Sequence, residues 1–212
     1  EHRHEEILRQ ASMAKAFGVE ANEISVSDLK SFHPFLNVDG VKGAVHLPLD
    51  GQGDPANIAM ALAKGARDLG VKIFEDTKVT GLNTHNNSVS GVHWMNEFGE
   101  GLIKTENAAN CAGMWARDLA ESHGVTVPLH ACEHFYIVTE PVKNLSTLPV
   151  LRVPDEQAYY KEDAGKFLVG AFELLAKPWG MDGIDENFCF DQLPEDLDHF
   201  EPILEKAVNR IP

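Results

Sequence analysis

The stretch from Asn107 to Ser122 (NAANCAGMWARDLAES) constrains the fold of this chain more than any other part of its sequence. Small residues lead to Gly113, Trp115 follows, and residues 115–124 have the pattern of a helix that ends at a glycine. A strand that turns into a helix at a glycine is where α/β proteins often hold a phosphate group or a cofactor. A tightly packed helix–strand crossing would need the same small residues, so both explanations fit this turn.

The composition is that of an ordinary globular protein. The 212 residues are 43% hydrophobic and 24% charged, which indicates one large domain or two small ones. The net charge of −15 argues against nucleic acid and anionic membrane surfaces as partners. No apolar run approaches the roughly 20 residues that a membrane-spanning helix needs, so we expect no membrane insertion.

Cysteine and histidine spacing gives no metal or disulfide pattern. The three cysteines are odd in number and far apart, and none belongs to a CxxC pair. The ten histidines include no HExxH spacing. We therefore expect no metal site, and a reducing compartment is favoured.

Helical patterns occupy both ends and the middle of the chain. Residues 5–17 form one apolar-faced pattern, a short helix follows with Ser27 as its expected N-cap, and residues 193–211 form the last helical region. Asp54 as N-cap and Pro55 at the first position predict a further helix. Its expected inward stripe is Ile58, Leu62, Ala66 and Leu69.

Strand patterns fill the rest. Residues 71–82, 83–96 with an Asn86–Asn87 turn, 97–113 and 129–141 are expected strands, and residues 158–173 are expected to form a hairpin that turns near residues 163–165. The order predicts a mixed α/β (α+β) fold with an antiparallel section between helices.

The sequence GQGDPA (Gly51 to Ala56) formally matches the dinucleotide fingerprint, and acidic residues lie about 20 positions further on. Pro48 would interrupt the preceding strand, because proline cannot donate to a central parallel sheet. Asp54 would place a carboxylate where the pyrophosphate should bind. An N-capped loop is therefore favoured over a nicotinamide-dependent dehydrogenase.

Polar side chains recur in the strand predicted for residues 129–141. His130, Cys132, His134 and Tyr136 stand at every second position and would share one face, which indicates a polar pocket wall rather than a zinc site. Tyr159 and Tyr160 fall on opposite faces of their strand, so at most one can line that pocket.

Four segments resemble, in order and spacing, the FAD-dependent amine oxidoreductases of the D-amino-acid-oxidase type. Within that family the resemblance is to the dimethylglycine and sarcosine dehydrogenases. The segments are residues 50–82, 107–142, 151–173 and 199–212.

The resemblance implies a substrate domain with part of an FAD-binding domain. Residues 1–70 would be a helical segment linking the two, residues 71–116 a partial FAD-binding domain with a β-meander and a terminal strand, and residues 117–212 the substrate domain with an antiparallel sheet. The family's N-terminal Rossmann βαβ unit is not found in this sequence, so we expect a piece of a longer protein.

The resemblance also implies roles for single residues. Val79 would meet the adenine end of FAD, and Ala112, Gly113 and Trp115 would lie against the cofactor, with Cys111 in place of the usual alanine. His134 and Tyr160 would be active-site residues facing the flavin ring. Phe135, Lys161 and Glu162 depart from the family pattern around them.

The implied reaction is oxidation of an N-methyl amino acid such as sarcosine or dimethylglycine, by hydride transfer to FAD. The imine product would be hydrolysed or passed to tetrahydrofolate bound by a C-terminal region outside this sequence; which of the two occurs, and what accepts the electrons, are left open. The expected location is the bacterial cytoplasm or the mitochondrial matrix. Alone, this chain is expected to hold no FAD tightly and to be inactive. The alternative is a regulatory relative like the pyruvate dehydrogenase phosphatase regulatory protein, although His134 and Tyr160 favour an enzyme.

Overall fold

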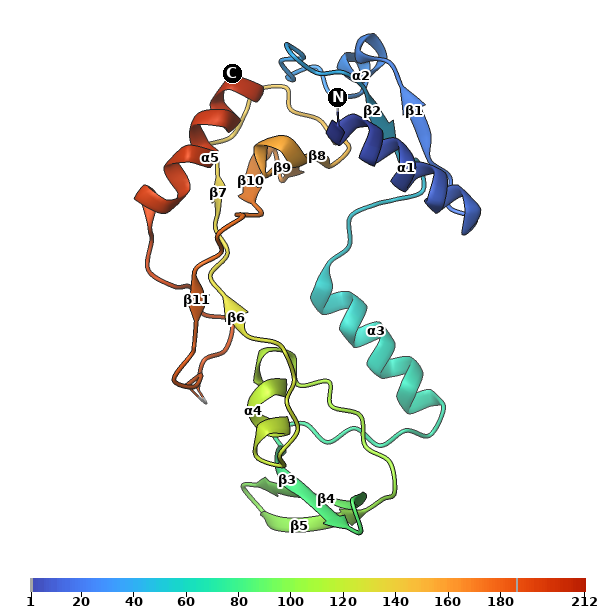
Figure 1. The fold of residues 1–212 in the computed structure, drawn as a ribbon, viewed down its shortest axis with the longest axis vertical. Helices are drawn as coiled ribbons and strands as arrows, with labels where there is room; N and C mark the ends of the chain where they lie inside the picture. The colour runs from blue at the N-terminus through green and yellow to red at the C-terminus, as the bar shows by residue number, and fades with distance from the viewer. Residues whose placement is uncertain (1, 186) are drawn as a thin grey trace. The chain divides into compact units, whose positions relative to one another are not determined.

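The computed structural model describes residues 2–185 and 187–212, so residue 1 of the first expected segment lies outside it. The chain forms two compact units, each of which is described by itself (Figure 1). The first unit comprises Glu1–Gly53, His134–Ala176 and Leu193–Pro212, and the second comprises Asp54–Glu133 and Lys177–Gln192. The three-part division expected from the resemblance stays a prediction.

The first unit is built on a four-stranded antiparallel sheet in the order β7-β10-β9-β8. These strands are β7 (Tyr136–Val138), β10 (Lys166–Ala171), β9 (Ala158–Asp163) and β8 (Leu151–Val153). The helix α5 (Leu197–Arg210) covers one face of the sheet with Phe200, Ile203 and Ala207. The core therefore lies on that side, and the opposite face is free to carry polar side chains.

The hairpin of β9 and β10 is confirmed, with its turn at Ala164 and Gly165. Both residues have positive φ, at 52° and 78°, which is the backbone that a tight hairpin turn requires. The last helix is also confirmed, but Pro202 lies inside it rather than at its start, and Asp196 is the N-cap.

The strand expected over residues 129–141 is wrong. The chain forms β6 (Ala131–Cys132), which pairs with β11 (Pro178–Trp179) in the second unit, and then β7 in the first. His130, Cys132, His134 and Tyr136 therefore do not share one strand face, because the chain leaves one ladder and joins another between them.

The N-terminal part of the first unit contains α1 (His2–Ala16), β1 (Asn22–Ile24), α2 (Val26–Phe32) and β2 (Ala44–His46), with β1 and β2 paired. The side chain of Ser25, not that of Ser27, caps α2 by accepting from the backbone N–H of Asp28.

A buried arginine joins this part to the rest of the unit. Arg210 of α5 is 8% exposed and donates to the carboxylate of Glu156, in the short helix η2 (Pro154–Glu156). It also donates to the backbone carbonyls of Asn37 and Asp39. Three segments distant in sequence are thus held by one guanidinium group.

The second unit contains a β-meander of β3 (Lys78–His85), β4 (Ser88–Asn96) and β5 (Gly99–Lys104). Asn86 and Asn87 form the expected turn, with φ of 50° and 60°. The short helix η1 (Gly113–Trp115) leads into α4 (Ala116–Glu121), and the backbone N–H of Leu82 donates to Nε2 of His123 just after it.

The helix α3 (Pro55–Asp68) begins as predicted, because the Asp54 side chain accepts from the backbone N–H of Asn57 at 2.8 Å. Its expected inward stripe is wrong for the described structure: Leu62 is 70% exposed and Leu69 is 87% exposed. Residues 71–77 and 105–112 form no strand, because no described segment lies alongside to complete a ladder with them. Within the described residues, no helix is both long and apolar enough to cross a membrane.

Candidate active site

A row of four residues crosses the open face of the sheet in the first unit. Tyr136 lies opposite Gly170, Gly170 opposite Tyr159, and Tyr159 opposite Arg152. Directly opposed residues in antiparallel strands point to the same side. The row therefore brings two phenols and a guanidinium group together on the side of the sheet away from α5.

The absence of a side chain at Gly170 is what lets the Tyr159 ring lie flat on the sheet. A β-carbon at position 170 would stand 2.1 Å from Cζ and 2.2 Å from the hydroxyl oxygen of Tyr159. Real contacts of this kind are longer than 3.0 Å. The ring thus occupies the space that any other residue would fill.

Three rings pack together beside this row and are called the aromatic cluster: His134, Tyr159 and Phe172. The Phe172 centroid lies 5.2 Å from that of His134 and 5.3 Å from that of Tyr159, and the His134 and Tyr159 rings are 6.5 Å apart and nearly parallel. The guanidinium carbon of Arg152 lies 4.8 Å above the Phe172 ring. The cluster is therefore a continuous aromatic surface, with the Phe172 ring tilted against the other two and a cation at one side.

A buried carboxylate lies at the His134 end of the cluster. The Glu173 side chain is 7% exposed, and its Oε2 lies 3.5 Å from Nδ1 of His134. Its Oε1 is buried without a hydrogen-bond partner. Burial first, and then the nearby Tyr136 and Glu173, raise the pKa of Tyr159. Tyr159 therefore stays protonated at neutral pH and can donate a hydrogen bond.

Tyr160 lies on the other face of β9, in the core beneath α5. It is 1% exposed, and its hydroxyl oxygen is buried without a partner. Burial, together with the charge of Glu156, raises the pKa of Tyr160 well above its usual value, against a lowering by Arg210. The structure does not bring Tyr160 together with His134, so its catalytic role stays a prediction. Tyr159 is the tyrosine whose ring packs with those of His134 and Phe172.

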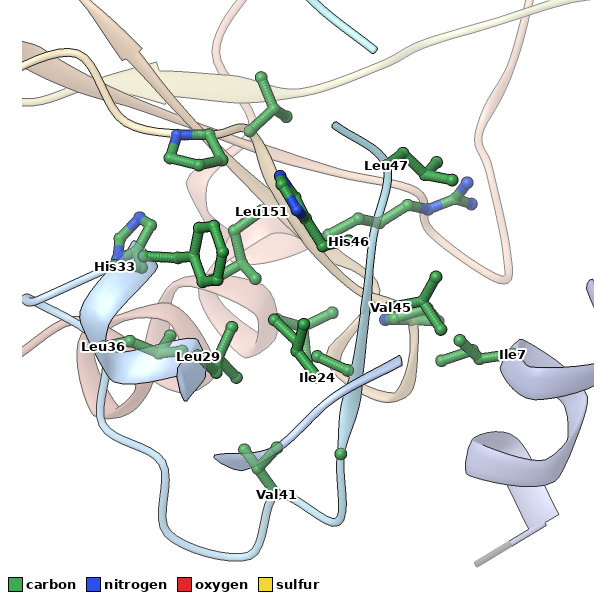
Figure 2. A pocket seen from close by; sticks show the side chains of 18 of the residues that line it. Ile7, Ile24, Leu29, His33, Leu36, Val41, Val45, His46, Leu47 and Leu151 are labelled. Carbon is green, nitrogen blue, oxygen red and sulfur yellow. The ribbon is translucent and has the colours of Figure 1, made fainter. Parts of the chain in front are cut away.

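Arg152 also borders a cavity of about 1200 Å³ within the first unit. Figure 2 shows apolar side chains from α1, β1, α2 and β2 facing this space, among them Ile7, Ile24, Leu29 and Val45. Sequence patterns had not predicted this cavity, because its walls come from segments far apart in the chain. Arg152 is thus an exposed residue that also lines this cavity.

The expected cofactor-binding residues all lie in the second unit. Val79 on β3 is 42% exposed, and Trp115 at the end of η1 is 39% exposed. The side chain of Asn110 closes the turn by donating to the carbonyl of Ala116 and accepting from the N–H of Ala112.

The turn itself presents open backbone. Gly113 has φ of +54°, and among the described residues no atom beyond its immediate chain neighbours lies within 4 Å of where its β-carbon would be. Small residues from Ala108 to Gly113 leave the polypeptide accessible, with Trp115 as one large surface beside it. This arrangement fits the close approach of a flat, polar group such as FAD. By contrast, Asp54 caps α3 and places its carboxylate where GQGDPA would have to bind a pyrophosphate.

Among the described residues, no three His, Cys, Asp or Glu side chains are placed to hold a metal ion.

Comparisons with known proteins agree with these features. The chain is 32% identical over 220 residues to human mitochondrial sarcosine dehydrogenase, and this alignment covers 99% of this chain and 23% of that protein. It is 35% identical over 210 residues to the mouse mitochondrial pyruvate dehydrogenase phosphatase regulatory subunit, covering 97% of this chain and 23% of that protein. The chain thus spans about a quarter of the length of these relatives.

A solved structure shares the fold. That of L-proline dehydrogenase from P. horikoshii superposes with a TM-score of 0.77 at 23% identity, and the match covers 100% of this chain and 54% of that one. The family model described as FAD dependent oxidoreductase (DAO) matches residues 1–212. The chain therefore belongs to the DAO family of FAD-dependent oxidoreductases.

Proposed function

We propose that this chain is part of an FAD-dependent enzyme that oxidises the N-methyl group of an amino acid such as sarcosine or dimethylglycine. The observation that carries the proposal is the open sheet face, where Arg152, the aromatic cluster and Glu173 stand together. The similarity to sarcosine dehydrogenase supports the substrate class.

Arg152 is suited to hold the substrate carboxylate. Among the described residues no carboxylate is paired with it, and its guanidinium group lies over the Phe172 ring. A guanidinium group can bind a carboxylate through two parallel hydrogen bonds, and stacking on an aromatic ring fixes its plane. The amino acid would then lie with its carboxylate at Arg152 and its amine toward His134.

His134 and Tyr159 are suited to position the amine. The His134 side chain is 44% exposed, so a ligand can reach it. An amine must lose its proton before it can give up hydride, and a neutral imidazole can accept that proton. The protonated Tyr159 hydroxyl can donate to the substrate. Bound FAD would accept the hydride equivalent, with Val79, Ala112, Gly113 and Trp115 as the residues of this chain that would hold it.

The proposal extends to FAD binding by this chain alone, to the fate of the one-carbon unit and to the location of the protein. The 212-residue chain alone is expected to hold no FAD tightly and to be inactive, because the family's pyrophosphate-binding turn is not in its sequence. The imine product would be hydrolysed, or its one-carbon unit passed to tetrahydrofolate elsewhere in the full-length protein. The mitochondrial matrix or the bacterial cytoplasm is the proposed location, the first by similarity to a mitochondrial relative.

A regulatory role is the second candidate, and the 35% identity to the phosphatase regulatory subunit favours it. The two are separated by the visible spectrum of the full-length protein. A flavin spectrum that sarcosine or dimethylglycine bleaches under anaerobic conditions supports the enzyme. A full-length protein without flavin, or with flavin that neither compound reduces, supports the regulatory subunit.

A further inference from the structure

Glu173 is a buried carboxylate with one polar neighbour. Its Oε2 lies 3.5 Å from Nδ1 of His134, and its Oε1 has no partner among the described residues. A buried carboxylate is costly unless a hydrogen-bond donor faces it. The imidazole N–H of His134 is the donor that the structure offers.

We propose that Glu173 holds the proton of neutral His134 on Nδ1, so that Nε2 faces the substrate as the proton acceptor. A neutral imidazole carries one N–H and one bare nitrogen, and a carboxylate beside one nitrogen decides which is which. Glu173 is thus a positioning residue that acts through His134. The inference rests on the proposed function only for the identity of the group that Nε2 meets.

The packing around His134 holds the ring in the orientation that this requires. Phe172 lies 5.2 Å from the imidazole, and Tyr159 lies nearly parallel to it at 6.5 Å, with an interplanar angle of 16°. Glu173 is nearly inaccessible, while the His134 side chain is 44% exposed. Because Nδ1 faces the buried carboxylate, Nε2 is the ring nitrogen left to meet a ligand.

The sequence neighbourhood explains how the pair forms. His134 lies two residues before β7, and Glu173 lies two residues after β10, its antiparallel neighbour. The antiparallel register places the start of β7 beside the end of β10, as the hydrogen bond from the N–H of Ala171 to the carbonyl of Phe135 shows. Histidine and glutamate therefore meet at the same edge of the sheet.

The tautomer can be measured directly. Full-length protein with ¹³C,¹⁵N-labelled histidine would be studied by NMR at a pH where the imidazole is neutral, without substrate, and the His134 signal identified by its loss in H134N. We expect the Nδ1-protonated form to predominate in the wild type and the Nε2-protonated form in E173M, which has no side-chain acceptor oxygen. The matched control E140M changes an exposed glutamate and should leave the tautomer unchanged.

A wild-type His134 protonated mainly on Nε2 would overturn the inference, whether or not E173M folds. So would an E173M protein in which Nδ1 keeps the proton. Both results are independent of whether sarcosine reduces the flavin, so they are distinct from failure of the proposed function.

Kinetics give a second test of the same pair. E173M should slow flavin reduction by the substrate about tenfold, as loss of a group that orients a ligating or catalytic histidine typically does. In an H134N background the same change should have less than a twofold effect, because Glu173 then has no histidine to orient. Equal effects in both backgrounds would contradict a role through His134.

Discussion

The ring of Tyr159 lies over Gly170, so that a β-carbon at position 170 would stand 2.1 Å from Tyr159 Cζ. G170A must therefore expel the ring from the sheet face and open the aromatic cluster. We expect substrate binding in the full-length enzyme to weaken about tenfold, or about 1.4 kcal/mol. Titration of flavin bleaching with sarcosine measures this. In a Y159A background, G170A should add less than a twofold effect, and a full additional loss there would contradict the proposed contact.

The two adjacent tyrosines are predicted to behave differently. The ring of Tyr159 packs with that of His134 on the open face of the sheet, whereas Tyr160 is 1% exposed beneath α5. Y159F should lower kcat/KM at least tenfold, because it removes the donor on the open face. Y160F should lower it less than about threefold. The opposite order would restore Tyr160 as the catalytic tyrosine and exclude Tyr159.

The buried phenol of Tyr160 also predicts a pH dependence of stability. Its pKa is raised in the folded protein, mainly by burial, so the folded state binds this proton more tightly than the unfolded state. The contribution is fully present below the unfolded value of about 10 and is lost as the pH rises above it. Urea unfolding at pH 7 and pH 11 should show a smaller loss of unfolding free energy for Y160F than for the wild type. An identical loss in both would contradict this assignment.

Arg210 is predicted to be structural. It is 8% exposed and joins Glu156 to the carbonyls of Asn37 and Asp39. R210M would leave the Glu156 carboxylate, whose side chain is 16% exposed, unpaired, which typically costs about 3 kcal/mol. The urea midpoint should fall accordingly, whereas R67M, at an exposed ion pair with Glu75, should change the unfolding free energy by less than about 1 kcal/mol. Equal effects of the two changes would contradict a structural role of Arg210 in joining these segments.

The sequence correctly predicted those helix caps and turns that are determined by residues adjacent in the chain. The Asp54 cap of α3, the Asn86–Asn87 turn and the hairpin turn at Gly165 depend on neighbouring residues, and each is present. The inward stripe of α3 failed because burial depends on what a helix packs against, which its own sequence does not state. Residues 71–77 failed as a strand for the same reason.

The sequence allowed only part of the candidate site to be proposed. The family resemblance selected His134, and strand alternation showed that only one of Tyr159 and Tyr160 could join it. Choosing between the tyrosines required the register of β9 against β10, which places Tyr159 opposite Gly170. Glu173 and Arg152 were missed because a single charged residue near a strand end carries no spacing pattern. The alternation of phenol, glycine and guanidinium across four strands appears only once the strands are paired.

The measurement that tests the proposed substrate site most directly is the dissociation constant of sarcosine in Arg152→Met full-length enzyme, from anaerobic flavin bleaching. Lys161→Met is the matched control, because Lys161 lies two residues from Tyr159 on the same strand and its cation is paired with Asp163. We predict that R152M raises the dissociation constant at least tenfold and that K161M changes it less than twofold. Unchanged binding in R152M, or an equal loss in K161M, would contradict the placement of the substrate carboxylate on Arg152.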